Sequence, residues 1–150
     1  MMTGAFIALV VHKPALALPL AFVSHFAIDM IPHYGYGDVP FHLRDTQKHF
    51  LIKQTIDAYF ALVLLWTVPY FLQSHVTPLV VSLCMLLAFL PDVVWPYQYV
   101  MAKRRGGYPP AFNWYARFHK AIQWCEKPWG AFVELGWFVG IIAAMKLIVS

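Results

Sequence analysis

The sequence predicts an all-α membrane protein, and three observations carry that prediction. Of the 150 residues, 61% are hydrophobic and 12% are charged, whereas a soluble globular domain averages about 45 to 50% apolar and about 25% charged residues. The mean hydropathy of +0.60 excludes a disordered chain. Four apolar stretches each approach the roughly 20 residues that a helix needs to cross ~30 Å of hydrocarbon. Nothing in them resembles the alternating pattern of an outer-membrane barrel strand.

The four stretches predict a single integral membrane domain over residues 1–150. Each span is expected to be helical, because backbone groups in lipid must find partners within their own segment. A shorter apolar stretch, Thr3 to Val11, precedes the first span and predicts a re-entrant or interfacial half-helix. A signal peptide is not expected there, since a basic region and a cleavage site are lacking. The predicted spans are residues 14–31, 51–73, 76–100 and 129–149.

Basic residues gather in the two long loops between the spans. Arg44 and Lys48 lie in the first loop, and the second, residues 101–128, carries a larger group of lysines and arginines. In the turn between the second and third spans, His75 is the only residue that can carry a charge. By the positive-inside rule, both long loops face the cytoplasm, in the inner membrane of a bacterium. The pI of about 9.1 then reflects topology and contact with membrane lipids, so nucleic acid is not an expected partner.

Residues 113–126 of the second loop predict an amphipathic helix that lies on the membrane surface. Asn113 can cap it, and its apolar positions recur at helical spacing. The arginines of this region, Arg104, Arg105 and Arg117, are expected to hold a lipid headgroup or a substrate phosphate.

Four of the seven acidic residues fall inside predicted spans, one in each: Asp29, Asp57, Asp92 and Glu134. Counted from the cytoplasmic end of each span, all four lie roughly 5 to 12 Å below one interface. Carboxylates at one level of a low-dielectric bundle repel each other, so protons or cations are needed beside them. Ionisable groups inside spans point to a functional site.

Histidines beside these acids favour a metal ion. His25, Asp29 and His33 are spaced i, i+4, i+8 along one face of the first span. Two imidazoles and a carboxylate suit zinc, manganese or iron. We therefore predict a divalent metal ion, Zn²⁺ with Mn²⁺ as the alternative, whose ligands are His25, Asp29, His33, Asp57 and Asp92.

Other assignments for these acids stay open. Asp57 can form an ion pair with Lys53, and Asp92, which follows Pro91, can be bridged through water to carbonyls that a proline kink frees. Glu134 and His49 are second-rank candidates for the site, and a protonated structural role for Glu134 is an equal alternative.

The polar face of the interfacial helix supplies candidate catalytic groups. His119, Gln123 and Glu126 follow at i, i+4, i+7, and the helix lies at the surface above the acid layer. His119 and Glu126 are predicted to act as the general acid or base. The alternative is a solvated polar face.

The first span also carries a resemblance. Gly4-Ala5 and residues 19–33 resemble a family of small uncharacterised bacterial integral membrane proteins with a Ser-His-Phe-x-x-Asp-x-x-Pro-His signature. Members of that family usually carry a histidine directly before the Gly-Ala pair, where this chain has Thr3.

Two hydrolase groups are partially similar. Leu90-Pro91-Asp92 resembles the Leu-Pro-Asp element of bacterial membrane-bound metal-dependent hydrolases, although there it precedes the His-x3-Asp helix. The first-span pattern is similar to that of zinc-dependent phospholipases C and single-strand nucleases. This second resemblance implies zinc ligands at His25, Asp29 and His33.

These patterns together predict a metal-dependent membrane hydrolase that acts on a phosphoester of a lipid or lipid-linked substrate at the cytoplasmic interface. The alternative is non-enzymatic: the same acid layer holds a cation or a proton in a membrane carrier. Four helices are few for a carrier, so this alternative implies a homo-oligomer.

Overall fold

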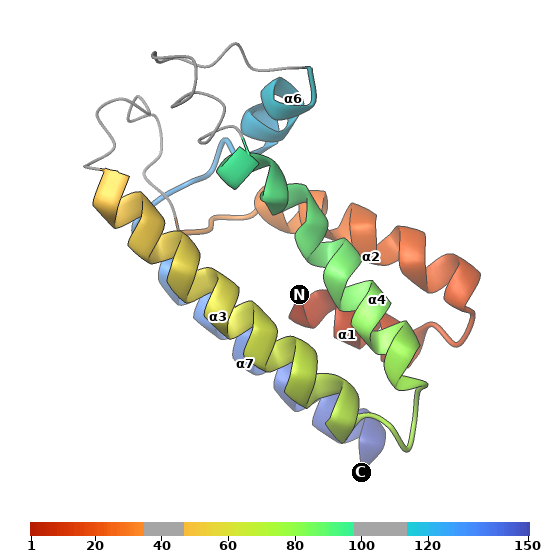
Figure 1. Cartoon of the computed structure of the whole chain (residues 1–150). Coiled ribbons are helices and arrows are strands. Elements are labelled where there is room, and N and C mark those ends of the chain that lie inside the picture. Colours follow the sequence, from red (N-terminus) through yellow and green to blue (C-terminus); the bar gives the residue numbers. More distant parts are fainter. Residues whose placement is uncertain (35–46, 98–113) are drawn as a thin grey trace.

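The computed structural model describes residues 1–34, 47–97 and 114–150, and the regular elements within these ranges are all helices (Figure 1). The all-α prediction is therefore confirmed. In chain order the elements are α1 (Met2–Val10), α2 (Pro14–Asp29), α3 (Gln47–Phe71), α4 (Pro78–Phe89), the 3-10 helix η1 (Leu90–Val93), α6 (Trp114–Ile122) and α7 (Gly130–Val149).

Two of the described helices are long and apolar enough to cross a membrane, not the four that were predicted. They are Pro78–Tyr97, which includes α4 and η1, and Gly130–Val149, each of 20 residues. Helix α2 has 16 residues, so it rises about 24 Å and falls short of the ~30 Å hydrocarbon layer. In α3, which has 25 residues, the apolar segment among the described residues is Thr55–Phe71.

The N-terminal half-helix is a packed core element. Helix α1 contacts α2, α3, α4 and α7, and Ala5 and Ala8 on it are completely or almost completely buried. Gly4 lies so close to the backbone carbonyl of Cys84 on α4 that a Cβ atom would overlap it. Small residues therefore let α1 approach α4, and α1 fills the space that α2 and α4 share.

Most of the buried core lies among α1, α2 and α4, with smaller contributions from α3 and α7, and the rest of α7 is largely uncovered. The core includes Ala17 and Ala21 on α2 and Val81 and Met85 on α4. Helix α7 instead exposes a series of large apolar side chains: Phe132, Leu135, Val139, Ile142, Leu147 and Ile148. Two candidate spanning helices and this apolar surface are weak support for a membrane protein.

A proline changes the course of the helix after α4. The chain turns from α-helix to 3-10 helix at Leu90, and Pro91 lies in the first turn of η1. In a 3-10 turn residue 91 would donate its N–H to the carbonyl of residue 88, and proline has no N–H to give. The Ala88 carbonyl therefore loses one helical donor, and Asp92 follows directly in the tightened turn.

Helix α6 ends earlier than the predicted helix over residues 113–126. It stops at Ile122, and the non-helical residues 123–129 lead into α7. Asn113, the predicted cap, and most residues of the two basic loops lie outside the described residues. The predicted cytoplasmic orientation of those loops stays a prediction.

Candidate metal centre

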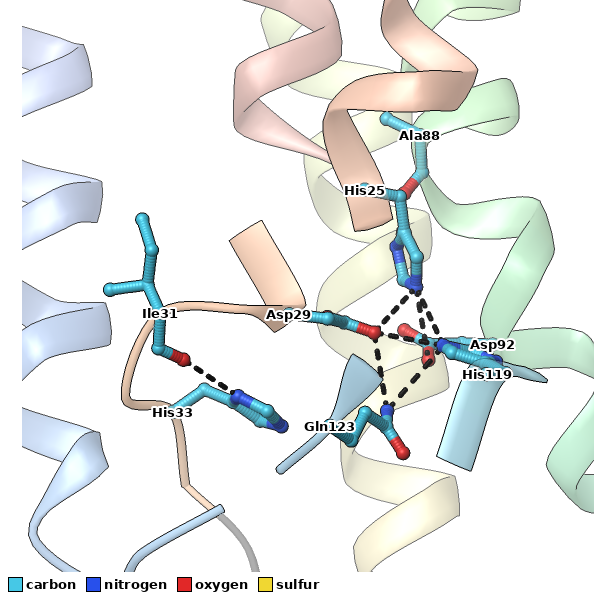
Figure 2. Close-up of polar contacts among 8 residues, drawn as sticks. All are labelled: His25, Asp29, Ile31, His33, Ala88, Asp92, His119 and Gln123. Atoms are coloured by element: carbon cyan, nitrogen blue, oxygen red, sulfur yellow. Dashed lines mark hydrogen bonds and ion pairs between the residues drawn. The ribbon is translucent and has the colours of Figure 1, made fainter. Parts of the chain in front are cut away.

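Four side chains that can ligate a metal converge from three elements (Figure 2). His25 and Asp29 come from α2, Asp92 from η1 and His119 from α6, and one ligand atom of each lies within 4.8 Å of all the others. His119 is fully buried, whereas the Asp92 side chain is 42% exposed. We call these four residues the metal group. His25 and Asp29 are also buried, so Asp92 is the most exposed member of the group.

His25 is held in the orientation of a metal ligand. Its Nδ1–H donates to the Ala88 carbonyl oxygen at 2.9 Å, the acceptor that Pro91 deprives of a helical donor. The opposite ring atom, Nε2, therefore faces the group, 3.2 Å from Asp29 Oδ2 and 3.5 Å from Asp92 Oδ1. Histidines that ligate metals almost always donate their other ring N–H to a carbonyl or carboxylate in this way.

Asp29 accepts hydrogen bonds from two side chains, one on α6 and one directly after it. Its Oδ2 accepts a hydrogen bond from His119 Nε2 at 2.8 Å and another from the side-chain amide of Gln123 at 3.2 Å. His119 Nε2 also lies 3.2 Å from His25 Nε2. Helix α6 is thus joined to the end of α2 through His119 and Gln123.

The arrangement concentrates lone pairs in one place. Because the Nδ1 proton of His25 is used by Ala88, the Nε2 of a neutral His25 ring presents a lone pair to the oxygens of Asp29 and Asp92. Such acceptors repel each other in a poorly solvated environment unless a cation or a proton lies between them. The His119 Nε2–H supplies one such proton to Asp29, and a metal ion held by the group would replace it. Two imidazole nitrogens and two carboxylate oxygens form a donor set that suits Zn²⁺ or Mn²⁺.

Aromatic rings fix His119 in place. Trp95 stacks on its imidazole with ring centroids 5.3 Å apart, and Phe26 and Tyr115 contact it at 5.8 and 6.0 Å. Burial raises the pKa of the Tyr115 phenol, and the nearby carboxylates of Asp92 and Asp29 raise it further. The phenol therefore stays protonated, and the wall beside His119 is uncharged.

Two predicted ligands lie outside the metal group. Helix α2 ends at Asp29, so His33 does not continue its face; the His33 Nδ1–H donates to the Ile31 carbonyl at 2.9 Å. Figure 2 shows His33 apart from the four converging side chains. Asp57 is exposed on α3, a helix that packs on α4 and α1. Metal ligation by His33 and Asp57 stays a prediction.

The second-rank and catalytic candidates have separate positions. His119, predicted as an acid or base, lies inside the metal group, and Glu126 pairs with the backbone of His33 in an isolated β-bridge. Glu134 accepts the backbone N–H of Tyr34 at 2.9 Å. Arg117 is exposed on α6. The His49 side chain, Arg104 and Arg105 lie outside the part of the chain that the structure describes.

Sequence reasoning missed two supporting contacts. Gln123 was expected with His119 and Glu126 on the face above the acid layer, but its bond to Asp29 was not specified, and the stacking of Trp95 on His119 was not predicted. The spacing of His119 and Gln123 by one turn was the signal for the first contact. No local pattern signals the second, because Trp95 and His119 are distant in the chain.

Comparisons of the chain with protein-family models, with curated proteins and with solved structures found no significant match. The fold and the site define an all-helical protein with a buried His/Asp group that can hold a metal ion. Any function must be inferred from that group and its surroundings.

Proposed function

We propose that this chain is a metal-dependent hydrolase of the bacterial inner membrane, and that it cleaves a phosphoester of a lipid or lipid-linked substrate. One observation carries the proposal: His25, Asp29, Asp92 and His119 each bring one ligand atom to within 4.8 Å of the other three. Their second-sphere contacts, Ala88 to His25 and Gln123 to Asp29, are those expected of a metal centre.

The proposed membrane arrangement has four helices crossing the bilayer, two of them short. Pro78–Tyr97 and Gly130–Val149 have the required length, and the apolar segments Pro14–Asp29 and Thr55–Phe71 are shorter. A short apolar helix is accommodated by local thinning of the bilayer at modest cost. The metal group includes His119 of α6, a helix whose exposed Trp114, Phe118 and Arg117 suit a membrane surface. The long loops would face the cytoplasm.

The proposed chemistry uses the open side of the group. A metal ion held by this group would supply a coordinated water with a lowered pKa, to about 7 in the case of zinc, and would polarise a phosphoryl oxygen. The exposed part of Asp92 marks the side from which a substrate can approach. Arg117, with Arg104 and Arg105, would hold the phosphate, and Glu126 would move a proton.

A specific observation favours a second candidate, a cation-binding membrane protein without turnover. The metal group offers four protein ligands, which is a complete tetrahedral set for zinc. Structural zinc sites are closed in this way, whereas catalytic sites keep one position for water. A centre with six positions, which Mn²⁺ favours, would retain open positions beside the same four ligands. In the second candidate the chain would act as a homo-oligomeric carrier or binding protein.

Metal analysis of the purified full chain tests the shared premise. Protein extracted in detergent should contain a stoichiometric divalent metal, and His25→Ala, Asp29→Ala and Asp92→Asn should each lose it. His75→Ala is the matched control, because His75 is exposed in the turn between α3 and α4. Absence of bound metal in every preparation, including protein dialysed against Zn²⁺ or Mn²⁺, would rule out both candidates.

Turnover separates the candidates. Metal-loaded protein in micelles is incubated with a panel of phospholipids and lipid-linked phosphoesters, and released phosphate or headgroup is measured. The hydrolase proposal expects release that depends on the metal and is lost in Asp92→Asn. Stoichiometric metal without release from any substrate would favour the cation-binding candidate.

A further inference from the structure

A set of backbone contacts joins the segment after α2 to the beginning of α7. The His33 carbonyl accepts the N–H of Lys127 at 2.9 Å, and His33 pairs with Glu126 in a parallel bridge. The next backbone N–H, that of Tyr34, donates to Glu134 Oε1 at 2.9 Å. We call this set, together with Gly130, the clamp.

Gly130 permits the closest approach in the clamp. It is the first residue of α7 and is buried, and a Cβ atom built on it would overlap the Cα and carbonyl of His33. Its own N–H donates to the Lys127 carbonyl at 2.9 Å. Any side chain at position 130 must therefore push His33 and the start of α7 apart, and the atoms in the way are backbone.

The clamp lies next to the metal group along both chain segments. His33 follows Asp29 by four residues, and Lys127 follows Gln123 by four residues. The clamp thus ties the segment beyond one ligand helix, α2, to the segment beyond the other, α6. Apart from the metal group itself, α6 meets α2 mainly through Phe26, whose ring contacts Phe118 and Tyr115.

From this geometry we infer that Gly130 and Glu134 are positioning residues of the metal centre, which hold His119 against His25 and Asp29. The inference rests on the proposed metal site and assigns α7 a part in it. Glu134 acts here as a backbone acceptor on Tyr34 and not as a ligand. A glutamine at position 134 keeps a side-chain oxygen that can accept the same N–H, whereas an alanine does not.

The test is a Co²⁺ titration of the full chain in detergent, followed by visible absorption. Outer contacts of metal sites typically change affinity by about 10- to 100-fold when they are removed. Gly130 and Glu134 contact His33 and Tyr34 and not a ligand, so we expect Gly130→Ala and Glu134→Ala to weaken Co²⁺ binding by up to about 10-fold, the lower end of that range. Both variants should also change the absorption spectrum, because the spectrum reports coordination geometry. Glu134→Gln should restore affinity and spectrum.

The matched control is Gly136→Ala, on the same helix, where an added Cβ meets no atom within 4 Å. It should bind Co²⁺ like the wild type. If Gly130→Ala does not fold, as judged by helicity and monodispersity, the comparison of Glu134→Ala with Glu134→Gln decides. Wild-type affinity and spectrum in Glu134→Ala, or equal weakening in Gly136→Ala, would overturn the clamp. Failure of the wild type itself to bind Co²⁺ would instead overturn the metal site.

Discussion

The two candidate spanning helices differ in how they meet the rest of the protein. In the most apolar 18-residue stretch of Pro78–Tyr97, 28% of the residues are buried in the protein, against 11% in the corresponding stretch of Gly130–Val149. The first helix packs on α1 and α2 through small residues such as Ala5, Ala17 and Ala21. The second presents large apolar side chains outward and touches the protein through the clamp and α1.

This difference explains where the polar chemistry lies. Ionisable groups are costly in lipid unless other protein groups surround them. The packed helices bury His25 and Asp29 and cover part of Asp92, whereas α7 has no comparable enclosure among the described residues. The acid of α7, Glu134, is accordingly used near the helix start, where a backbone N–H can reach it.

The largest expected effect on stability comes from shortening a buried side chain in the packed region. Met85 on α4 is fully buried, and Met85→Ala leaves a cavity that costs about 2 kcal/mol or more. The value should lie near the lower end of the usual range, because lipid tails are as apolar as the side chain and only packing is lost. Leu147→Ala on α7, where the side chain is 80% exposed, should stay within about 0.5 kcal/mol.

The measurement is the free energy of unfolding in mixed micelles as a denaturing detergent is increased. Similar losses for Met85→Ala and Leu147→Ala would break the contrast between the packed and the exposed helix.

The next effect concerns the metal group inside the packed region. Zn²⁺ at 10 times its Kd should stabilise the folded chain by about 1.4 kcal/mol, and a chelator should remove the gain. The reason is that the ligands converge only in the folded state. Thermal unfolding with and without Zn²⁺ measures the shift, and His25→Ala should abolish it. A shift of the same size in His25→Ala would place the metal elsewhere.

Half of the metal group followed directly from short-range sequence patterns. His25 and Asp29 are one helical turn apart, so any helix over this segment puts them on one face. Asp92 was predicted because an acid inside an apolar stretch needs a partner. His119 was placed at the site as an acid or base, since spacing along α6 shows its face but not its distance from α2.

Helix ends and helix rotation limited the remaining predictions. The i, i+8 position of His33 requires a helix that continues past Asp29, and α2 ends there, before Pro32. To predict where the Asp57 side chain points, one must know which face of α3 is turned inward. An apolar helix in lipid has no periodicity that reveals this face. Apolar length also overestimated the first span, because it does not indicate that α2 stops at Asp29.

A smaller effect is expected from the wall beside His119. Trp95 stacks on this ring at 5.3 Å and 30°, so Trp95→Leu should cost about 0.5 to 1.5 kcal/mol of metal binding, or roughly 2- to 12-fold in Kd. Trp66→Leu on α3 is the control, because Trp66 is 83% exposed and distant in the chain from every ligand. Isothermal titration with Zn²⁺ compares the two. Equal Kd values for both variants would show that stacking does not orient His119.

The smallest expected effect concerns one hydrogen bond that attaches α7 to α1. Trp137 Nε1–H donates to Thr3 Oγ1 at 3.1 Å, which links α7 to α1 away from the clamp. Hydrogen bonds between membrane helices contribute about 0.6 kcal/mol on average, so Thr3→Val, which keeps the shape of the side chain, should cost about that amount. The control is Thr67→Val, since Thr67 bonds the carbonyl of Val63 within its own helix. Unfolding in mixed micelles resolves the difference.

A loss above about 2 kcal/mol for Thr3→Val would be larger than one such bond can supply. It would mean that α7 depends on α1 for its position, and the clamp would then be a consequence of that packing instead of its cause.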